Sequence, residues 1–455
     1  MRALEIVAAI RSGGATATSV VEAALARIEA HNGTINAFTA VTVERARREA
    51  AAIDALKAQG KPLPPLAGVP YAVKNLFDVE GLATLAGSRL HESRRPATQD
   101  AMLVRRLREA GAILVGALNM DAYAYGFTTE NTAYGPTRNP RDPARSAGGS
   151  SGGSGAAVAA GMVPLALASD TNGSIRVPAS LCGVFGLKPT YGRLSRTGSF
   201  PFVYSLDHLG AMGATTDDVA ACYDAMQGPD ATDPASAQRP VEPVLQELVR
   251  GVDGLRVARL GGYFDINAGE EARAATRRVA NAFEGAREVE LPEVERARAA
   301  AFVITAAEGG TLHRKTLQQH YDGFEPHNRD RFLAGALTPG TWYVKAQKVR
   351  AWFAHRCSEI FERFDVLIAP ATPVVAQPLG AEWLELNGRS LPLRPSLGML
   401  TQPISCIGLP VMTVPVAGVS ALPIGVQLIA APWREDLCLR AAAHLERVGV
   451  ASCPA

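Results

Sequence analysis

Six short apolar runs recur along the chain, and stretches with helical patterning separate them. The runs are AGVPYAVKN, GAILVGA, MVPLALASD, DVLIAPATP, VMTVPVA and PIGVQLIAAP. Because they lack the alternation of apolar and polar residues that a half-exposed strand shows, they are typical of strands buried on both faces. We therefore predict an α/β fold in which a large mixed, mainly parallel β-sheet core is covered by helices on both faces.

Two further segments indicate how the chain is organised. Residues 19–32 have the pattern of an amphipathic helix, with Ser19 and Glu22 in the register of a capping box, so we expect Ser19 to be the N-cap. Residues 227–243 are rich in Pro and Asp, which predicts a surface connection between two lobes.

Composition and charge exclude several classes of protein. Apolar residues make up 47% of the chain and charged residues 20%, a balance typical of a globular core. The net charge is +2, and no block of like charges is present that would follow a nucleic-acid backbone or an anionic membrane. The six cysteines are scattered without a CxxC pair, which argues against a disulfide framework or a zinc site. We expect a cytoplasmic protein with a small-molecule substrate, and the sequence shows neither a secretory signal nor a membrane span.

The glycine- and serine-rich run RSAGGSSGGSG, residues 145–155, permits two interpretations. A run of this composition is typical of a flexible linker. It nevertheless leads directly into AAVAAGMVPLALASD, which has the pattern of a helix followed by a strand, so its glycines lie at a helix entrance. Glycines there allow close backbone approach and expose N–H donors. A phosphate loop is excluded because no GxxxxGK[ST] motif is present.

A serine follows the next strand at a tight turn, Asn172-Gly173-Ser174. A serine hydroxyl becomes a good nucleophile only when a base takes its proton. The eight histidines are dispersed and none occurs in a familiar hydrolase setting, which disfavours a histidine base. Lys74 is flanked by apolar residues, and burial would keep its amine neutral. Taken alone, Lys74 is better described as a strand-end lysine that reaches solvent, and the company of the other motifs favours the base.

Three segments together resemble the amidase signature family: AGVPYAVKN, AGGSSGGSGAAVAAG and SDTNGSIRVPASLCGVFGLKPT. The similarity extends over nearly the whole chain and is weakest over about residues 265–335. It implies a single amidase signature domain over residues 1–455. Within it we expect a core catalytic region over about residues 60–225 and a more variable helical lobe over about residues 244–360.

The resemblance implies a Ser-cisSer-Lys triad for amide hydrolysis. Residue by residue, the family motifs place the base at Lys74, the bridging serine at Ser150 and the nucleophile at Ser174. Ser150 and Ser174 reproduce the family's interval between these two serines, and the other serines of the glycine-rich run do not. Ser151 is expected to support the site. The family's chemistry requires neither a metal nor an organic cofactor.

The turn at the nucleophile is expected to supply the oxyanion hole. The family pattern assigns this role to the backbone N–H groups of Thr171, Asn172, Gly173 and Ser174, each contributing about 3 kcal/mol in comparable sites. Many relatives have glycine where this chain has Asn172, so its side chain is a candidate hydrogen-bonding partner for a polar substrate.

Asp170 and Arg176 flank the nucleophile in the sequence and are expected to support the site. Two roles remain open for this acid–base pair. It could brace the turn as an ion pair, or it could contact the substrate.

Two branches of the family are similar to the whole chain. One contains the glutamine-hydrolysing A subunits of tRNA-dependent amidotransferases, and the other hydrolyses 1-carboxybiuret in cyanuric acid degradation. The glutaminases have an aspartate for the substrate's ammonium group at the position of Gly398, and without it an ammonium group would be unpaired. Arg331 is the counterpart of an arginine that binds a carboxylate. Gln402 and Ser405 are candidates to contact ureido groups, or to satisfy backbone groups at the sheet edge.

A carboxylated substrate without an amino group is therefore expected, most simply 1-carboxybiuret, which would give 1,3-dicarboxyurea and ammonia. One alternative is a glutamine-hydrolysing amidotransferase chain of the first branch. Another is a catalytically inactive scaffold, which the intact triad disfavours. Relatives of both enzyme types associate with a small helical subunit, so we also expect an accessory chain of that kind in a hetero-oligomer.

Overall fold

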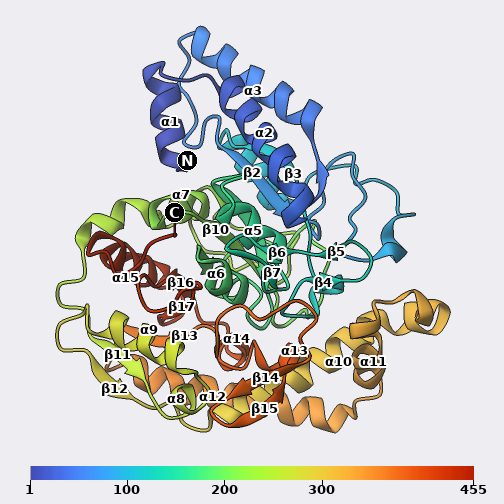
Figure 1. Cartoon of the computed structure of the whole chain (residues 1–455), viewed down its shortest axis with the longest axis vertical. Helices are drawn as coiled ribbons and strands as arrows, with labels where there is room; N and C mark the ends of the chain where they lie inside the picture. Colours follow the sequence, from blue (N-terminus) through green and yellow to red (C-terminus); the bar gives the residue numbers. More distant parts are fainter. Residues whose placement is uncertain (1, 455) are drawn as a thin grey trace.

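The computed structural model describes residues 2–454, and its largest element is a sheet of 11 strands (Figure 1). The strand order is β1-β3-β2-β8-β10-β9-β16-β17-β13-β11-β12. All six apolar runs contribute a strand to this sheet. Its strands are β1 (Phe38–Val41), β2 (Pro70–Lys74), β3 (Ile113–Leu118), β8 (Leu165–Asp170), β9 (Phe185–Lys188), β10 (His208–Gly213), β11 (Val257–Leu260), β12 (Arg287–Val289), β13 (Val366–Pro370), β16 (Val411–Pro415) and β17 (Gly425–Ile429).

The predicted large mixed sheet is confirmed, and its parallel pairs fall in two blocks rather than throughout. Strands β3, β2 and β8 pair in parallel, as do β13, β11 and β12. The strands between these blocks, and β1 at the edge, pair antiparallel. Strands buried on both faces have the same apolar composition in either direction, so the sequence runs did not distinguish the two kinds of pairing.

Helices cover both faces of the sheet. Helices α5 (Gly152–Ala159) and α6 (Arg176–Cys182) contact each other and the middle strands. A second group, α4 (Met102–Glu109), α7 (Thr216–Met226) and α15 (Glu435–Arg447), contacts strands of the same sheet. Helix α9 (Glu270–Ala280) lies against β13 and β17. Helix α1 (Ala3–Ser12) contacts α7, and both ends of the chain lie near α7 in Figure 1.

The predicted N-terminal helix is longer than its sequence pattern and begins earlier. Helix α2 runs over Ala17–Ile35 and packs against α3 (Val43–Ala58). Its N-cap is Thr16, whose side chain accepts a hydrogen bond from the Ser19 N–H, while the Ser19 hydroxyl accepts one from the Thr16 N–H. The prediction of Ser19 as N-cap was therefore wrong, because Ser19 is the returning partner of the capping box.

Three helices that follow β12 form a group in the lower part of the structure (Figure 1). Helix α10 (Val294–His320) contacts α11 (Pro326–Ala336), α12 (Gly340–Phe361) and the short helix α14 (Gln402–Cys406). The segment over residues 244–360 also contributes β11 and β12, so it is not helical throughout. Within residues 2–454, no helix is both long and apolar enough to span a membrane.

The remaining elements are short. Three two-stranded sheets pair β4 (Glu130–Asn131) with β5 (Gly135–Pro136), β6 (Arg138–Asn139) with β7 (Asp142–Ser146), and β14 (Trp383–Leu386) with β15 (Arg389–Pro392). The short helices are α8 (Tyr263–Ile266), α13 (Leu393–Ser396) and the 3₁₀ turns Arg89–His91, Ala122–Ala124, Leu245–Arg250 and Tyr321–Gly323.

Candidate active site

Lys74 lies at the end of β2 and is fully buried, so it does not reach solvent. Strands β2 and β8 are parallel neighbours, which brings their carboxyl ends to the same edge of the sheet. Lys74 Nζ lies 2.7 Å from Ser150 Oγ and 2.9 Å from Ser169 Oγ. The predicted pair of Lys74 and Ser150 is thus in hydrogen-bond contact, and Ser169 is a second partner that the sequence interpretation did not assign.

Burial lowers the pKa of Lys74 to about 7, although three carboxylates oppose this shift. They are Asp121, Asp170 and Asp207, and each favours the charged amine. A substantial fraction of Lys74 is therefore neutral near pH 7, the form that can accept a proton.

The glycine-serine run is a tightly packed part of the core and not a linker, since Ala147 through Val158 are all buried. The peptide bond between Gly149 and Ser150 is cis. A Cβ at Gly149 would lie 2.7 Å from the Thr128 nitrogen and would also meet the Asp121 carboxylate. The Ser151 hydroxyl donates to the Ser169 carbonyl at 3.1 Å, which links the run to β8.

The turn after β8 is held by a buried ion pair. The Asp170 carboxylate accepts hydrogen bonds from the Arg176 Nε and Nη2 atoms, both at 2.9 Å. Burial raises the pKa of Asp170, but the Arg176 guanidinium outweighs this and holds that pKa well below its ordinary value. Both side chains are fully buried, and neither lines the pocket described below. Of the two roles left open for this pair, the structure therefore favours bracing the turn.

The same carboxylate occupies one of the four N–H groups expected in the oxyanion hole. The Gly173 N–H donates to Asp170 Oδ1 at 2.7 Å, so it has an acceptor before any substrate binds. The N–H groups of Thr171, Asn172 and Ser174 have no acceptor among residues 2–454. The oxyanion-hole prediction accordingly narrows to these three groups, because a donor already paired to a carboxylate is not free for an oxyanion.

Ser405 also belongs to the framework of the turn. Its hydroxyl contacts Arg176 Nη2 and lies 3.2 Å from Asp170 Oδ1. Ser405 is fully buried in this cluster and is not among the residues that line the pocket described below.

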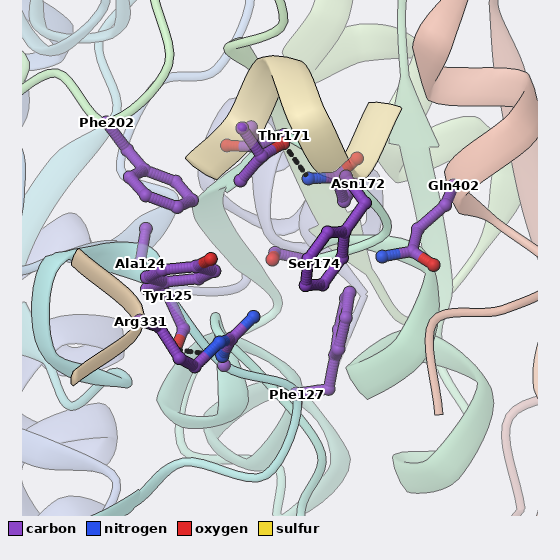
Figure 2. Close-up of a pocket in the computed structure, with 12 residues that line it drawn as sticks. Ala124, Tyr125, Phe127, Thr171, Asn172, Ser174, Phe202, Arg331 and Gln402 are labelled. Carbon is purple, nitrogen blue, oxygen red and sulfur yellow. Dashed lines mark hydrogen bonds between the residues drawn. The ribbon is translucent and has the colours of Figure 1, made fainter. Parts of the chain in front are cut away.

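A pocket opens at Ser174 and contains both residues that the sequence suggested for substrate binding, Arg331 and Gln402 (Figure 2). The described residues that line it are Ala124, Tyr125, Gly126, Phe127, Thr171, Asn172, Ser174, Phe202, Phe302, Thr305, Arg331 and Gln402. Helices α10 and α11 supply Phe302, Thr305 and Arg331. The lobe where the family resemblance is weakest therefore forms one wall of the pocket.

Arg331 enters this pocket without a carboxylate partner among the described residues. Its guanidinium carbon lies 3.5 Å from the centroid of the Tyr125 ring, and its Nη1 lies 3.4 Å from the Tyr125 carbonyl oxygen. Burial lowers the pKa of Arg331, yet an arginine side chain stays charged at neutral pH. A half-buried cation that is held by an aromatic ring, with no anion paired to it among the described residues, is suited to bind a carboxylate from a ligand.

Two amide side chains in the pocket are oriented by helix α10. Arg298 donates to Gln402 Oε1 at 2.9 Å, which leaves the Gln402 NH₂ group as the end that faces the pocket (Figure 2). Asn172 Nδ2 donates to Thr305 Oγ1 at 2.8 Å, and Asn172 Oδ1 is buried with no partner among the described residues. The sequence interpretation missed Arg298 and Thr305, since neither belongs to a motif.

Comparison with known proteins identifies the family. The Amidase family model matches residues 19–439. The chain belongs to the amidase family. This amidase is 57% identical over 454 residues to AtzE, a 1-carboxybiuret hydrolase subunit from Pseudomonas sp. (strain ADP), with 99% of each chain covered. It is 40% identical to the A subunit of the glutamyl-tRNA(Gln) amidotransferase from Moorella thermoacetica (strain ATCC 39073 / JCM 9320), covering 92% of this chain and 91% of the other.

A solved structure gives the same result for the fold. It is described as a vestigial protein complex that reveals the evolutionary origins of an s-triazine catabolic enzyme. The amidase superposes on it with a TM-score of 0.99 at 56% sequence identity, and the superposition covers 100% of both chains. The resemblance inferred from the motifs is therefore confirmed at the level of the family and of the fold.

Metal ligands are not clustered in the amidase. Over residues 2–454 no group of three or more His, Cys, Asp or Glu side chains is placed to hold a metal ion. The chemistry considered below uses serine, lysine and backbone groups.

Proposed function

We propose that this amidase hydrolyses 1-carboxybiuret to 1,3-dicarboxyurea and ammonia. One observation carries the proposal: the pocket at Ser174 holds Arg331, a half-buried cation, and none of the described residues that line the pocket is a carboxylate. Such a pocket suits an uncharged amide with a carboxylate at its far end. The 57% identity to a chain of a 1-carboxybiuret hydrolase supports the same substrate.

The proposed mechanism begins with proton transfer from the nucleophile. Neutral Lys74 takes a proton from Ser150 while Ser150 takes one from Ser174, and the Ser174 oxygen attacks the terminal amide carbonyl. The N–H groups of Thr171, Asn172 and Ser174 stabilise the oxyanion. Ser150 then returns a proton to the leaving nitrogen, the C–N bond breaks and ammonia departs.

Water completes the reaction. It attacks the ester between Ser174 and the remaining acyl group, giving up a proton through Ser150 to Lys74. The bond to Ser174 breaks, its oxygen regains a proton, and the new carboxyl group leaves as part of 1,3-dicarboxyurea. In sum one water is consumed and one ammonia is formed.

Three side chains are proposed to hold the substrate. Arg331 binds the carboxylate, the Gln402 NH₂ group donates to a carbonyl of the ureido chain, and Asn172 Oδ1 accepts from an N–H group. Each assignment uses the end of the side chain that the protein leaves unpaired. Asp170, Arg176 and Ser151 act only through the framework that positions Ser174 and Ser150.

Ammonia release from freshly prepared 1-carboxybiuret tests the proposal, with biuret and L-glutamine in parallel and Ser174→Ala as the blank. Ammonia from 1-carboxybiuret alone, absent in the variant, is the expected result. Ammonia from glutamine instead would overturn it and would make a glutamine-hydrolysing amidotransferase chain the better description, as the 40% identity to such a chain would permit.

An inactive scaffold is the other alternative, and the contact between Lys74 and Ser150 weighs against it. Labelling of Ser174 by a fluorophosphonate distinguishes an active enzyme from an inactive scaffold, since only an activated serine reacts. An unlabelled wild-type protein would favour the scaffold.

We further propose that the chain works in the cytoplasm as a single domain, together with a small helical accessory subunit. The sheet supports one domain because it contains strands from both sides of residues 227–243. The solved relative described as a protein complex supports a partner. Purification with the neighbouring gene products, followed by mass measurement of the intact complex, tests the accessory chain, and a fully active monomer would contradict it.

A further inference from the structure

The pocket at Ser174 is lined by one charged side chain, and that charge is positive. Apart from Arg331, the described residues that line it are aromatic, aliphatic, hydroxyl or amide side chains and glycine. A substrate carboxylate has a partner there, whereas a substrate ammonium group has none. Because an unpaired charge in a buried site is costly, the pocket discriminates against amides that carry an ammonium group.

Phe127 occupies one wall of the Ser174 pocket, where a second charged side chain would otherwise have room. Its ring is buried, lines the pocket and packs on Gly398. A Cβ built on Gly398 would lie within 2.8 Å of three atoms of that ring, Cζ, Cε2 and Cε1. The backbone of Gly398 is outside the left-handed region, so glycine is required there by the ring and not by the backbone conformation.

Gly398 is also close to the turn that carries the nucleophile. The Thr401 hydroxyl contacts the carbonyl oxygens of both residues, at 3.0 Å for Gly398 and at 2.6 Å for Asn172. A Cβ built on Gly173 would lie 3.4 Å from Phe127 Cε1, so the ring borders the turn as well. The Phe127 ring therefore occupies the space through which a side chain at position 398 would reach the pocket.

We propose that Phe127 is a specificity-determining residue of this amidase. Its ring, seated on Gly398, excludes any side chain at position 398 and leaves Arg331 as the charge that selects the substrate. The pocket then accepts amides with a carboxylate and rejects those that add an ammonium group. The proposal rests on the proposed function only in that the amide must bind in the Ser174 pocket.

A matched pair of amides tests this selectivity. Glutaramate and L-glutamine have the same number of chain atoms between amide and carboxylate as 1-carboxybiuret, and they differ only in the ammonium group. For the wild type we expect kcat/KM for glutaramate to exceed that for glutamine by about 100-fold or more, the loss that accompanies an unpaired buried charge. Where turnover is slow, the concentrations of the two amides that protect Ser174 from a fluorophosphonate give the same ratio.

Variants at positions 127 and 398 distinguish the effect of the Phe127 ring from the effect of a carboxylate at position 398. Gly398→Asp alone is expected to lose activity on both amides, because its side chain collides with the ring. Phe127→Ala with Gly398→Asp is expected to lower the preference for glutaramate at least about tenfold, because the new carboxylate pairs with the ammonium group. Phe127→Ala with Gly398→Asn, of the same size but uncharged, is the control and should keep the preference.

Two results would overturn the inference. One is an unchanged preference in the Asp double variant while Ser174 still reacts with the fluorophosphonate. The other is Gly398→Asp alone with wild-type activity. If the first double variant does not fold, Phe127→Ser with Gly398→Asp repeats the test with a small polar side chain in place of alanine. Hydrolysis of 1-carboxybiuret is assayed in parallel. If the wild type prefers glutaramate but does not hydrolyse 1-carboxybiuret, the proposed function is refuted. The role of Phe127 in selectivity is not refuted by that result.

Discussion

Lys74→Met is expected to abolish activity and to remove a cost to folding that depends on pH. Lys74 is fully buried, and burial lowers its pKa from 10.5 to about 7. Below about pH 7 the folded and unfolded chains both hold the proton, so the cost of burying this charge is fully present there. Between about pH 7 and 10.5 only the unfolded chain holds it, and the cost falls by about 1.4 kcal/mol for each pH unit.

The difference between these two pKa values corresponds to about 5 kcal/mol when the cost is fully present. Methionine has a similar length and no charge, so it removes this cost, although Ser150 and Ser169 each lose a hydrogen bond worth about 1 kcal/mol. The free energy lost with these hydrogen bonds does not change with pH, whereas the cost of burying the charged Lys74 does. The difference in unfolding free energy between variant and wild type should therefore shrink by about 2 kcal/mol from pH 7, where half of the folded protein still holds the proton, to pH 9.

Urea unfolding followed by circular dichroism at the two pH values measures this difference. Comparison with the wild type at each pH cancels the titration of all other groups, including the buried Lys188, whose pKa is also lowered to about 7 by burial. A difference that stays constant between pH 7 and pH 9 would refute the reasoning, because it would mean that Lys74 has an ordinary pKa in the folded protein. Ammonia release should fall at least about 1000-fold in the variant.

Three further outcomes are expected. The value of kcat/KM for 1-carboxybiuret should rise about tenfold from pH 6 to pH 8, because Lys74 loses its proton around pH 7, and a flat profile would contradict its role as base. Arg331→Met should lower kcat/KM at least about 100-fold, mainly through KM, whereas Arg329→Met on the same helix, which pairs with exposed carboxylates, should not; equal effects would exclude carboxylate binding by Arg331. Asp170→Asn should destabilise the protein by about 3 to 5 kcal/mol above pH 5 in urea unfolding, since it leaves Arg176 buried and unpaired; because the pKa of Asp170 is lowered in the folded protein, this loss should diminish in acid, as the wild-type carboxyl is protonated.

Local sequence patterns predicted the elements of the fold and the residues of the triad. The apolar runs gave strands because a segment without polar alternation has to be buried on both faces. Ser150 and Ser174 could be proposed because the motifs around them are continuous in sequence, and the close packing around Gly149 and Gly153 leaves no room for a Cβ at either position.

Properties that depend on neighbours far along the chain were not predicted. Gln402 is oriented by Arg298, and Asn172 by Thr305, through contacts across 104 and 133 residues. Neither contact leaves a periodic or local signal in the sequence. The Gly173 N–H is a local case, since its acceptor, the Asp170 carboxylate, lies only three residues earlier, and the sequence interpretation did not assign that hydrogen bond.

The sequence by itself therefore determined the strands and the family, because these follow from short-range patterns. Only the tertiary structure decided the direction of the strand pairs, the low pKa of Lys74 and the single positive charge of the pocket. The physical reason is that burial and pairing are properties of the space around a side chain. The order of strands in the sheet and the packing of α10 against α11 and α14 create that space.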